Sequence, residues 1–192
     1  SETPPARADA LDEAPADAET PTNGALFTST SDEWYTPPHL CDAVLHVFGE
    51  LPDLDPCTAD GALMEAKRKF TLAQDGLAQV WRARTLFLNP PFSAIDVWVE
   101  RLANAYRAGV GEAIALLPAH TETAWMRRLA PFPRCFLHER VKFISPSGES
   151  ASAPFPSVVI YMGDNLTAFA DAFAPLGDIY VSWQHGDAGS AS

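Results

Sequence analysis

The segment Thr85-Leu86-Phe87-Leu88-Asn89-Pro90-Pro91-Phe92 decides how this chain is organised. Its first four residues form a continuous apolar run, which predicts a buried strand. The two prolines end the strand, because each fixes φ and lacks a backbone N–H donor. An Asn amide and an aromatic ring flank them, so the loop combines hydrogen-bond acceptors with a flat apolar surface. Open α/β sheets bind ligands at the carboxyl ends of their strands, so the loop indicates chemistry on an exocyclic amine. A proline-bounded loop without function is the alternative.

Apolar runs and amphipathic segments alternate on both sides of this loop. Buried strands are expected at 53–57, 85–88 and 113–117. Helices are expected to begin at caps supplied by Thr36, Ser93 and Thr121, and the first is expected to end at Gly49. Alternating strands and helices predict an α/β fold in which helices cover a parallel sheet.

The last third of the chain has a different pattern. Strand-like runs occur at 135–137, 141–144, 158–162 and 179–183. Only one clear helix lies among them, with its apolar face at Leu166, Phe169, Ala170 and Phe173. Because parallel strands need long crossover connections, the sheet is expected to finish with antiparallel strands.

Length and charge suggest one folded domain with an acidic tail. A chain of 192 residues is long enough for a single substantial core. The formal net charge is -12, and residues 1–33 carry eight acidic side chains against the single Arg7. We therefore expect a disordered acidic tail at 1–31, one domain at 32–185 and a disordered C-terminus at 186–192.

The composition also limits the setting in which the protein works. No apolar stretch approaches bilayer-spanning length and no targeting segment is visible, so we expect a soluble monomer in the cytoplasm. Cys41, Cys57 and Cys135 are odd in number and widely spaced, which predicts reduced thiols and no metal site.

Two carboxylates follow predicted strands and could serve a cofactor. Asp55 ends the first strand, and Asp75 precedes the strand at 85–88. Carboxylates at strand ends can receive an ammonium group, a ribose hydroxyl or a base amino group, although each acid alone is better explained as a solvated loop residue. The chain lacks Gly-x-Gly-x-x-Gly, the Gly-Lys-Ser/Thr phosphate loop and His-Glu-x-x-His, so hydride transfer, phosphoryl transfer and zinc proteolysis lack their usual machinery.

Three basic side chains could contact a nucleic acid. Arg140 and Lys142 alternate with Val141 and Phe143, which places both cations on one face of a strand. That face could contact phosphates or form a solvated strand edge. His120 follows a predicted strand and could face the ligand crevice. The net negative charge argues against a nucleic-acid partner, because phosphate neutralisation supplies most of such affinity.

Six motifs in one order resemble the phage and prophage family of DNA N6-adenine methyltransferases. The resemblance covers about residues 32 to 163. The motifs are Glu33-Trp34-Tyr35-Thr36-Pro37-Pro38, Leu54-Asp55-Pro56-Cys57, Asp75-Gly76-Leu77 with Trp81, Asn89-Pro90-Pro91-Phe92, Leu116-Leu117-Pro118-Ala119 with Thr121 and Trp125, and Arg140-Val141-Lys142-Phe143. A fixed order of six elements is much harder to obtain by chance than any one of them.

The resemblance implies a Rossmann-like S-adenosylmethionine methyltransferase fold, mostly parallel with antiparallel C-terminal strands. It implies methyl transfer from S-adenosyl-L-methionine to N6 of adenine in DNA, by in-line attack of the flipped base. The implied catalytic loop is Asn89, Pro90, Pro91 and Phe92. The implied cofactor residues are Tyr35, Thr36 and Pro37 at the methionine part, Asp55, Pro56 and Cys57 beneath it, and Asp75 near the adenine. DNA contacts are expected from Arg140, Lys142 and His120.

Two other functions fit the same residues. A methyltransferase acting on RNA or on a protein glutamine could use the same Asn, proline carbonyls and aromatic ring. A domain that binds nucleic acid without catalysis is the second alternative.

Overall fold

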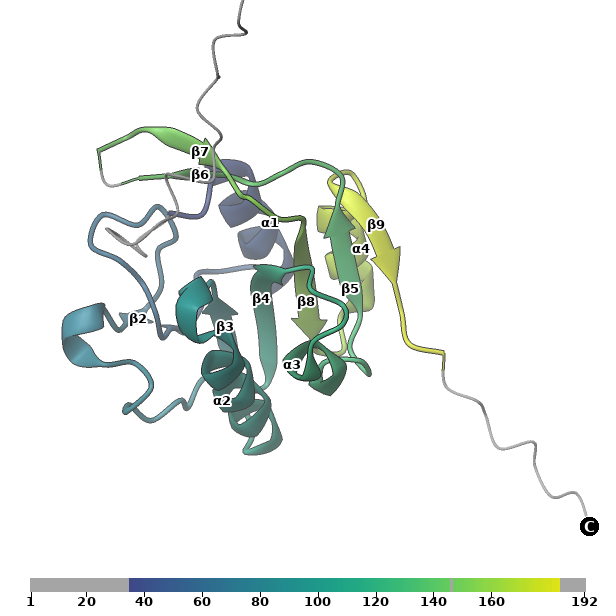
Figure 1. The fold of residues 1–192 in the computed structure, drawn as a ribbon. Helices are drawn as coiled ribbons and strands as arrows, with labels where there is room; N and C mark the ends of the chain where they lie inside the picture. Colours follow the sequence, from purple (N-terminus) through teal and green to yellow (C-terminus); the bar gives the residue numbers. More distant parts are fainter. Residues whose placement is uncertain (1–34, 146, 184–192) are drawn as a thin grey trace, which may run out of the picture.

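A seven-stranded sheet with the order β2-β1-β3-β4-β8-β5-β9 forms the middle layer of the protein (Figure 1). The computed structural model describes residues 35–145 and 147–183. The strands of this sheet are β1 Leu54–Asp55, β2 Arg68–Lys69, β3 Thr85–Leu88, β4 Glu112–Pro118, β5 Arg134–Leu137, β8 Ser157–Met162 and β9 Gly177–Tyr180. The segment 1–31, expected to be an acidic tail, and the segment 186–192 lie outside the described residues.

The sheet has a parallel half and an antiparallel half. Strands β2, β1, β3 and β4 pair in parallel, whereas β8, β5 and β9 join through antiparallel pairings. The expected antiparallel C-terminal strands are therefore present, and they account for three of the six pairings. β5 and β8 are connected through a hairpin and not through a crossover helix, which permits their antiparallel pairing.

Helices cover both faces of the sheet (Figure 1). Their bounds are α1 Pro38–Phe48, α2 Ile95–Arg107, α3 Ala124–Arg128 and α4 Leu166–Phe173. Alternate residues of β4 face opposite cores, since Ile114 and Leu116 pack with α1 and α4 while Ala115 and Leu117 pack with α2 and α3. Burial on both faces explains why β4 is an uninterrupted apolar run. No helix in the described part of the chain has the length and apolarity needed to cross a bilayer.

The helix starts differ from the expected caps. α1 is capped by Pro37 and not by Thr36, whose side-chain oxygen accepts a hydrogen bond from Asn89. A short 3-10 turn, η3 Phe92–Ala94, precedes α2, so Ser93 lies inside that turn and does not cap the helix. α3 is capped by the side chain of Thr123, two residues after the expected position. The expected end of α1 is confirmed, because Gly49 has the left-handed φ of 71°.

A two-stranded hairpin stands apart from the main sheet. It consists of β6 Lys142–Ile144 and β7 Ser150–Ser152, and sequence analysis missed β7 because Ser-Ala-Ser has no alternation of large apolar residues. Ile144 also forms an antiparallel bridge with Tyr35. This bridge places the segment before α1 beside the hairpin, at the edge of the sheet where the parallel strands end.

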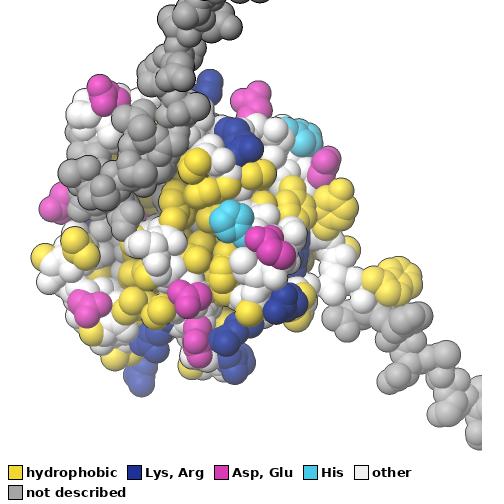
Figure 2. Space-filling model, viewed as in Figure 1, with side chains coloured by type: hydrophobic (Ala, Val, Ile, Leu, Met, Phe, Trp, Pro, Cys, Tyr) yellow, Lys and Arg dark blue, Asp and Glu magenta, His cyan; other side chains and the backbone are white. Residues whose placement is uncertain are grey.

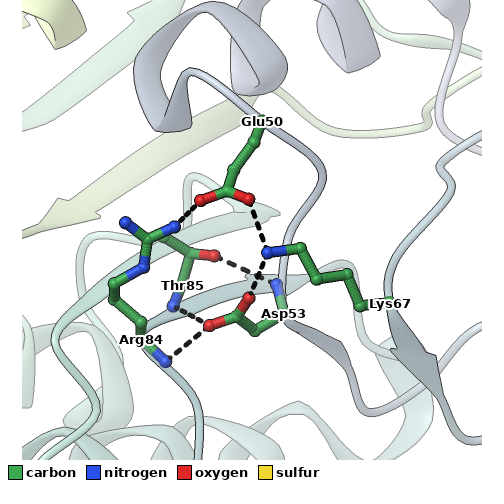
Figure 3. A network of polar contacts seen from close by, with 5 residues as sticks. All are labelled: Glu50, Asp53, Lys67, Arg84 and Thr85. Carbon is green, nitrogen blue, oxygen red and sulfur yellow. Dashed lines mark hydrogen bonds and ion pairs between the residues drawn. The ribbon is translucent and has the colours of Figure 1, made fainter.

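A polar network joins β1 and β3 at their amino ends (Figure 3). The Asp53 carboxylate accepts the backbone N–H of Arg84 at 2.9 Å, and the Asp53 backbone N–H donates to the Thr85 hydroxyl at 3.0 Å. Lys67 donates to Asp53 and to Glu50, which also pairs with Arg84. The hydrogen bond from Lys67 lowers the pKa of Asp53. The network pins the two strands at one end, so their carboxyl ends reach the opposite edge in a defined register.

Candidate active site

A pocket of about 400 Å³ opens at the carboxyl ends of β1 and β3. The chain leaves β1 toward β2 on one side and returns to β3 on the other, so the strand order reverses here. Such switch points are the usual ligand sites of open α/β sheets. The pocket is lined by Tyr35, Thr36, Asp55, Pro56, Cys57, Thr58, Ala59, Ala62, Met64, Thr71, Leu72, Asp75, Gly76, Phe87, Asn89, Pro91 and Trp98.

The floor of the pocket holds a buried carboxyl group. Asp55 is only 4% exposed, and its Oδ1 accepts the backbone N–H of Cys57 at 3.1 Å. Burial raises the pKa of Asp55 to about 7, although the Cys57 hydrogen bond and the charge of Lys69 act in the opposite direction. A carboxyl group without a cationic partner in direct contact becomes easier to ionise when a cation enters the pocket.

Asn89 is the meeting point of three chain segments. Its side-chain Nδ2 donates to the hydroxyl oxygen of Thr36 at 3.1 Å. Its backbone carbonyl accepts the Sγ–H of Cys57 at 3.2 Å. The loop after β3 is thereby tied to the segment before α1 and to the loop after β1. Asn89 is consequently held through its main chain and through its side chain.

The loop before β3 forms the third wall of the pocket. Asp75 has a φ of 48°, a left-handed conformation that Asp tolerates better than most residues do. At the next residue, Gly76, a Cβ atom would lie 1.7 Å from the carbonyl oxygen of Pro56, so only glycine permits this contact between the two loops. The close approach fixes Asp75 at the pocket. Leu72, 85% exposed, lies on the same wall.

The remaining walls of the pocket are apolar. Met64 and Phe87 are almost fully buried, and the ring of Trp98 stacks on Trp81 with centroids 5.9 Å apart. These residues escaped sequence analysis as site residues because their spacing matched that of ordinary core positions. Thr58 was missed as well, although it directly follows the Asp-Pro-Cys motif.

Phe92 lies outside this pocket, in an aromatic cluster. Its ring packs edge-on against Phe155, with centroids 4.7 Å apart, and against Phe143 at 5.9 Å. His120 packs on the other side of Phe155 at 5.4 Å. Figure 2 shows hydrophobic side chains gathered over the ends of β4 and β8 nearest to this cluster, whereas Lys and Arg gather near α2 and α3 at the opposite end. The loop at 89–92 therefore borders an apolar surface.

The two cations expected to contact DNA line a different hollow. Arg140 and Lys142 are exposed while Val141 is buried, which confirms that both point outward. They border a second pocket of about 440 Å³ together with His39 and His138.

Most of the expected site residues come together. Tyr35, Thr36, Asp55, Pro56, Cys57, Asp75, Asn89 and Pro91 all line the first pocket. Pro37, Pro90 and Phe92 do not, since Pro37 caps α1, Pro90 is buried and Phe92 faces the aromatic cluster. Within the described ranges, no three His, Cys, Asp or Glu side chains are grouped so that they could hold a metal ion.

A mixed α/β sheet with a ligand-sized pocket at its switch point defines the general class of this protein. Comparison with protein families then identifies it more closely. Residues 24–169 match the model of the DNA N-6-adenine-methyltransferase (Dam) family, and the chain belongs to that family. Members of this family methylate adenine in DNA and use S-adenosylmethionine, which agrees with the resemblance found in the sequence motifs. A comparison with curated proteins gives no match.

Proposed function

We propose that this protein transfers a methyl group from S-adenosyl-L-methionine to N6 of a flipped adenine in DNA, with residues 32–185 forming one Rossmann-like methyltransferase domain. One observation carries the proposal. The Asn-Pro-Pro loop borders a pocket whose other walls bear the acids expected to hold the cofactor. A group that binds the target amine and a group that binds the methyl donor then share one crevice.

The chemistry of the pocket fits the cofactor. Its volume of about 400 Å³ lies within the usual range for small-molecule sites, roughly 300 to 1,000 Å³. Buried apolar walls suit a purine ring, while the Asp55 carboxylate suits a positive charge. We assign Tyr35, Thr36 and the Asp55-Pro56-Cys57 loop to the methionine part, and Asp75 to the adenosine part. When bound, the cofactor supplies a methyl group made electrophilic by a sulfonium.

Asn89 acts on the target amine. We infer that its side-chain oxygen and the Pro90 carbonyl accept the two N6 hydrogens, which draws the nitrogen lone pair out of conjugation with the purine ring. Holding the amine at a fixed place also removes the entropic cost of orienting it. The extra proton can leave after the transfer, so the reaction requires neither a protein nucleophile nor a strong general base.

Base extrusion needs contributions from several contacts. Unstacking a paired base costs a few kcal/mol, and stacking on one aromatic ring returns about 1 to 3 kcal/mol. Phe92, already supported by Phe155, is the ring that we assign to this contact. Arg140 and Lys142 form no ion pair with any described carboxylate, so both are available to neutralise phosphates. His120 is assigned to the same nucleic-acid surface.

The net charge of -12 favours a second candidate substrate, a protein glutamine, and a base in RNA would fit the same loop. Transfer of a labelled methyl group to unmethylated DNA, RNA and protein, measured over a range of salt concentrations, separates these cases. We expect label at N6 of DNA adenine. Transfer to RNA or protein, with none to DNA at any salt concentration, would replace the proposed substrate. Failure to bind S-adenosylmethionine would indicate a domain without catalytic activity.

A further inference from the structure

The side chain of Asn89 is oriented by a residue from the segment before α1. Thr36 is 4% exposed, and its hydroxyl oxygen accepts the Nδ2–H of Asn89 at 3.1 Å. The backbone of Thr36 is itself well anchored. The preceding residue, Tyr35, exchanges two backbone hydrogen bonds with Ile144, at 2.8 and 3.2 Å, and its hydroxyl donates to the carbonyl of Asp60. The Thr36 hydroxyl is therefore held in place by its backbone, and it accepts the hydrogen bond from the Asn89 amide at a defined position.

Orientation matters because the two ends of an amide have opposite hydrogen-bonding character. A rotation of about 180° around χ2 exchanges the oxygen with the NH2 group, and this torsion is broad with two nearly equivalent settings. The oxygen can accept a hydrogen from an adenine N6 amine. The NH2 group can only donate, so it would oppose the amine of the target. In this structure the end of the amide that is bonded to Thr36 is the NH2 group.

We propose that Thr36 is the positioning residue that turns the Asn89 amide so that its oxygen, and not its NH2 group, meets the target amine. The inference rests on the proposed function of Asn89. The hydrogen bond from Cys57 Sγ acts on the Asn89 main chain, at its carbonyl. The bond from Nδ2 to Thr36 restrains χ2 directly. Cys57 thus restrains the main chain of Asn89, and Thr36 restrains its side chain.

Thr36→Val is the informative change, because it keeps the branched shape and removes the hydroxyl. We expect kcat for adenine methylation to fall about 10- to 100-fold, the effect of losing one orienting hydrogen bond. Thr36 is also assigned to the methionine part of the cofactor, so the Kd for S-adenosylmethionine, measured by titration calorimetry, should rise, but by a smaller factor than the fall in kcat, since backbone and ring contacts of the pocket remain. Thr36→Ser is the matched control. It retains the hydroxyl and should recover most of the lost kcat.

If the wild type methylates adenine, three results would overturn the proposal. One is a Thr36→Val enzyme with unchanged kcat. Another is a loss confined to the Kd of the cofactor, which would make Thr36 a cofactor ligand only. The third is a Thr36→Ser enzyme as slow as Thr36→Val. If the wild type itself transfers no methyl group to adenine, the proposed function fails first, and that outcome is recognised before any variant is made.

A spectroscopic measurement on the wild type covers the case in which Thr36→Val does not fold. The side-chain NH2 signals of Asn89, assigned with Asn89→Asp, should exchange slowly with solvent because one proton is bonded to a buried oxygen. The same signals in Thr36→Ser should remain protected. Rapid exchange of the Asn89 side-chain protons in the folded wild type would refute the orienting hydrogen bond.

Discussion

Asp55→Asn should make the folded protein more stable than the wild type at high pH, and it should weaken the binding of the cofactor. The carboxyl group is 4% exposed, and burial raises its pKa to about 7, against an ordinary value of 3.8. Between these two pH values the folded state binds a proton that the unfolded state has lost. Stability therefore falls as pH rises through this window, and it levels off above pH 7.

The magnitude follows from the pKa difference. Between pH 5 and pH 8, the free energy of unfolding of the wild type falls over about two pH units, from pH 5 to about pH 7. At about 1.36 kcal/mol per unit, the total loss is about 3 kcal/mol. Asn has no such titration, and its side-chain oxygen can still accept the Cys57 N–H. The difference in free energy of unfolding, variant minus wild type, should therefore rise by about 3 kcal/mol from pH 5 to pH 8.

Urea denaturation of both proteins at pH 5, 6, 7 and 8 measures this difference, because other titrating groups cancel between them. Asp171→Asn, at an exposed position on α4, controls for the change in net charge. A stability difference that stays constant over this range would refute the raised pKa. If the difference does rise, the ionised Asp55 carboxylate destabilises the folded state, which is a pattern common among carboxyl groups at functional sites.

Substitutions at four further residues test the other proposed roles. Asn89→Ala should abolish turnover but leave the cofactor Kd within a few-fold, as calorimetry can check, because Asn89 is assigned to the target; equal loss of both would contradict that role. Phe92→Ala should weaken productive capture of the base in single-turnover assays, and Phe92→Trp should keep partial activity; full activity of the alanine variant would make Phe92 a packing residue only. Arg140→Gln and Lys142→Gln should each lower the salt slope of DNA binding by about one, and an unchanged slope would return them to a solvated edge.

Strands β1, β3 and β4 of the parallel half were accessible from the sequence because their signals are local, whereas β2 was not predicted. Thr85–Leu88 was predicted to the residue, since a fully buried strand bounded by prolines has one simple pattern. The hairpin strand Ser150–Ser152 was not predicted. Its pairing with β6 depends on partners six to ten residues away, and three small residues carry no periodicity of their own.

Motif order in the sequence was enough to select the family and most of the pocket, because residues at the ends of neighbouring parallel strands must meet at one edge of the sheet. Tertiary structure alone decided which contacts those residues make. Thr36 was expected to cap a helix, and in the structure its hydroxyl accepts a hydrogen bond from Asn89. Phe92 was expected in the catalytic loop, and the structure adds that its ring packs on Phe155. The physical reason is that strand ends are set by local chemistry, whereas side-chain partners depend on segments that only the folded chain brings together.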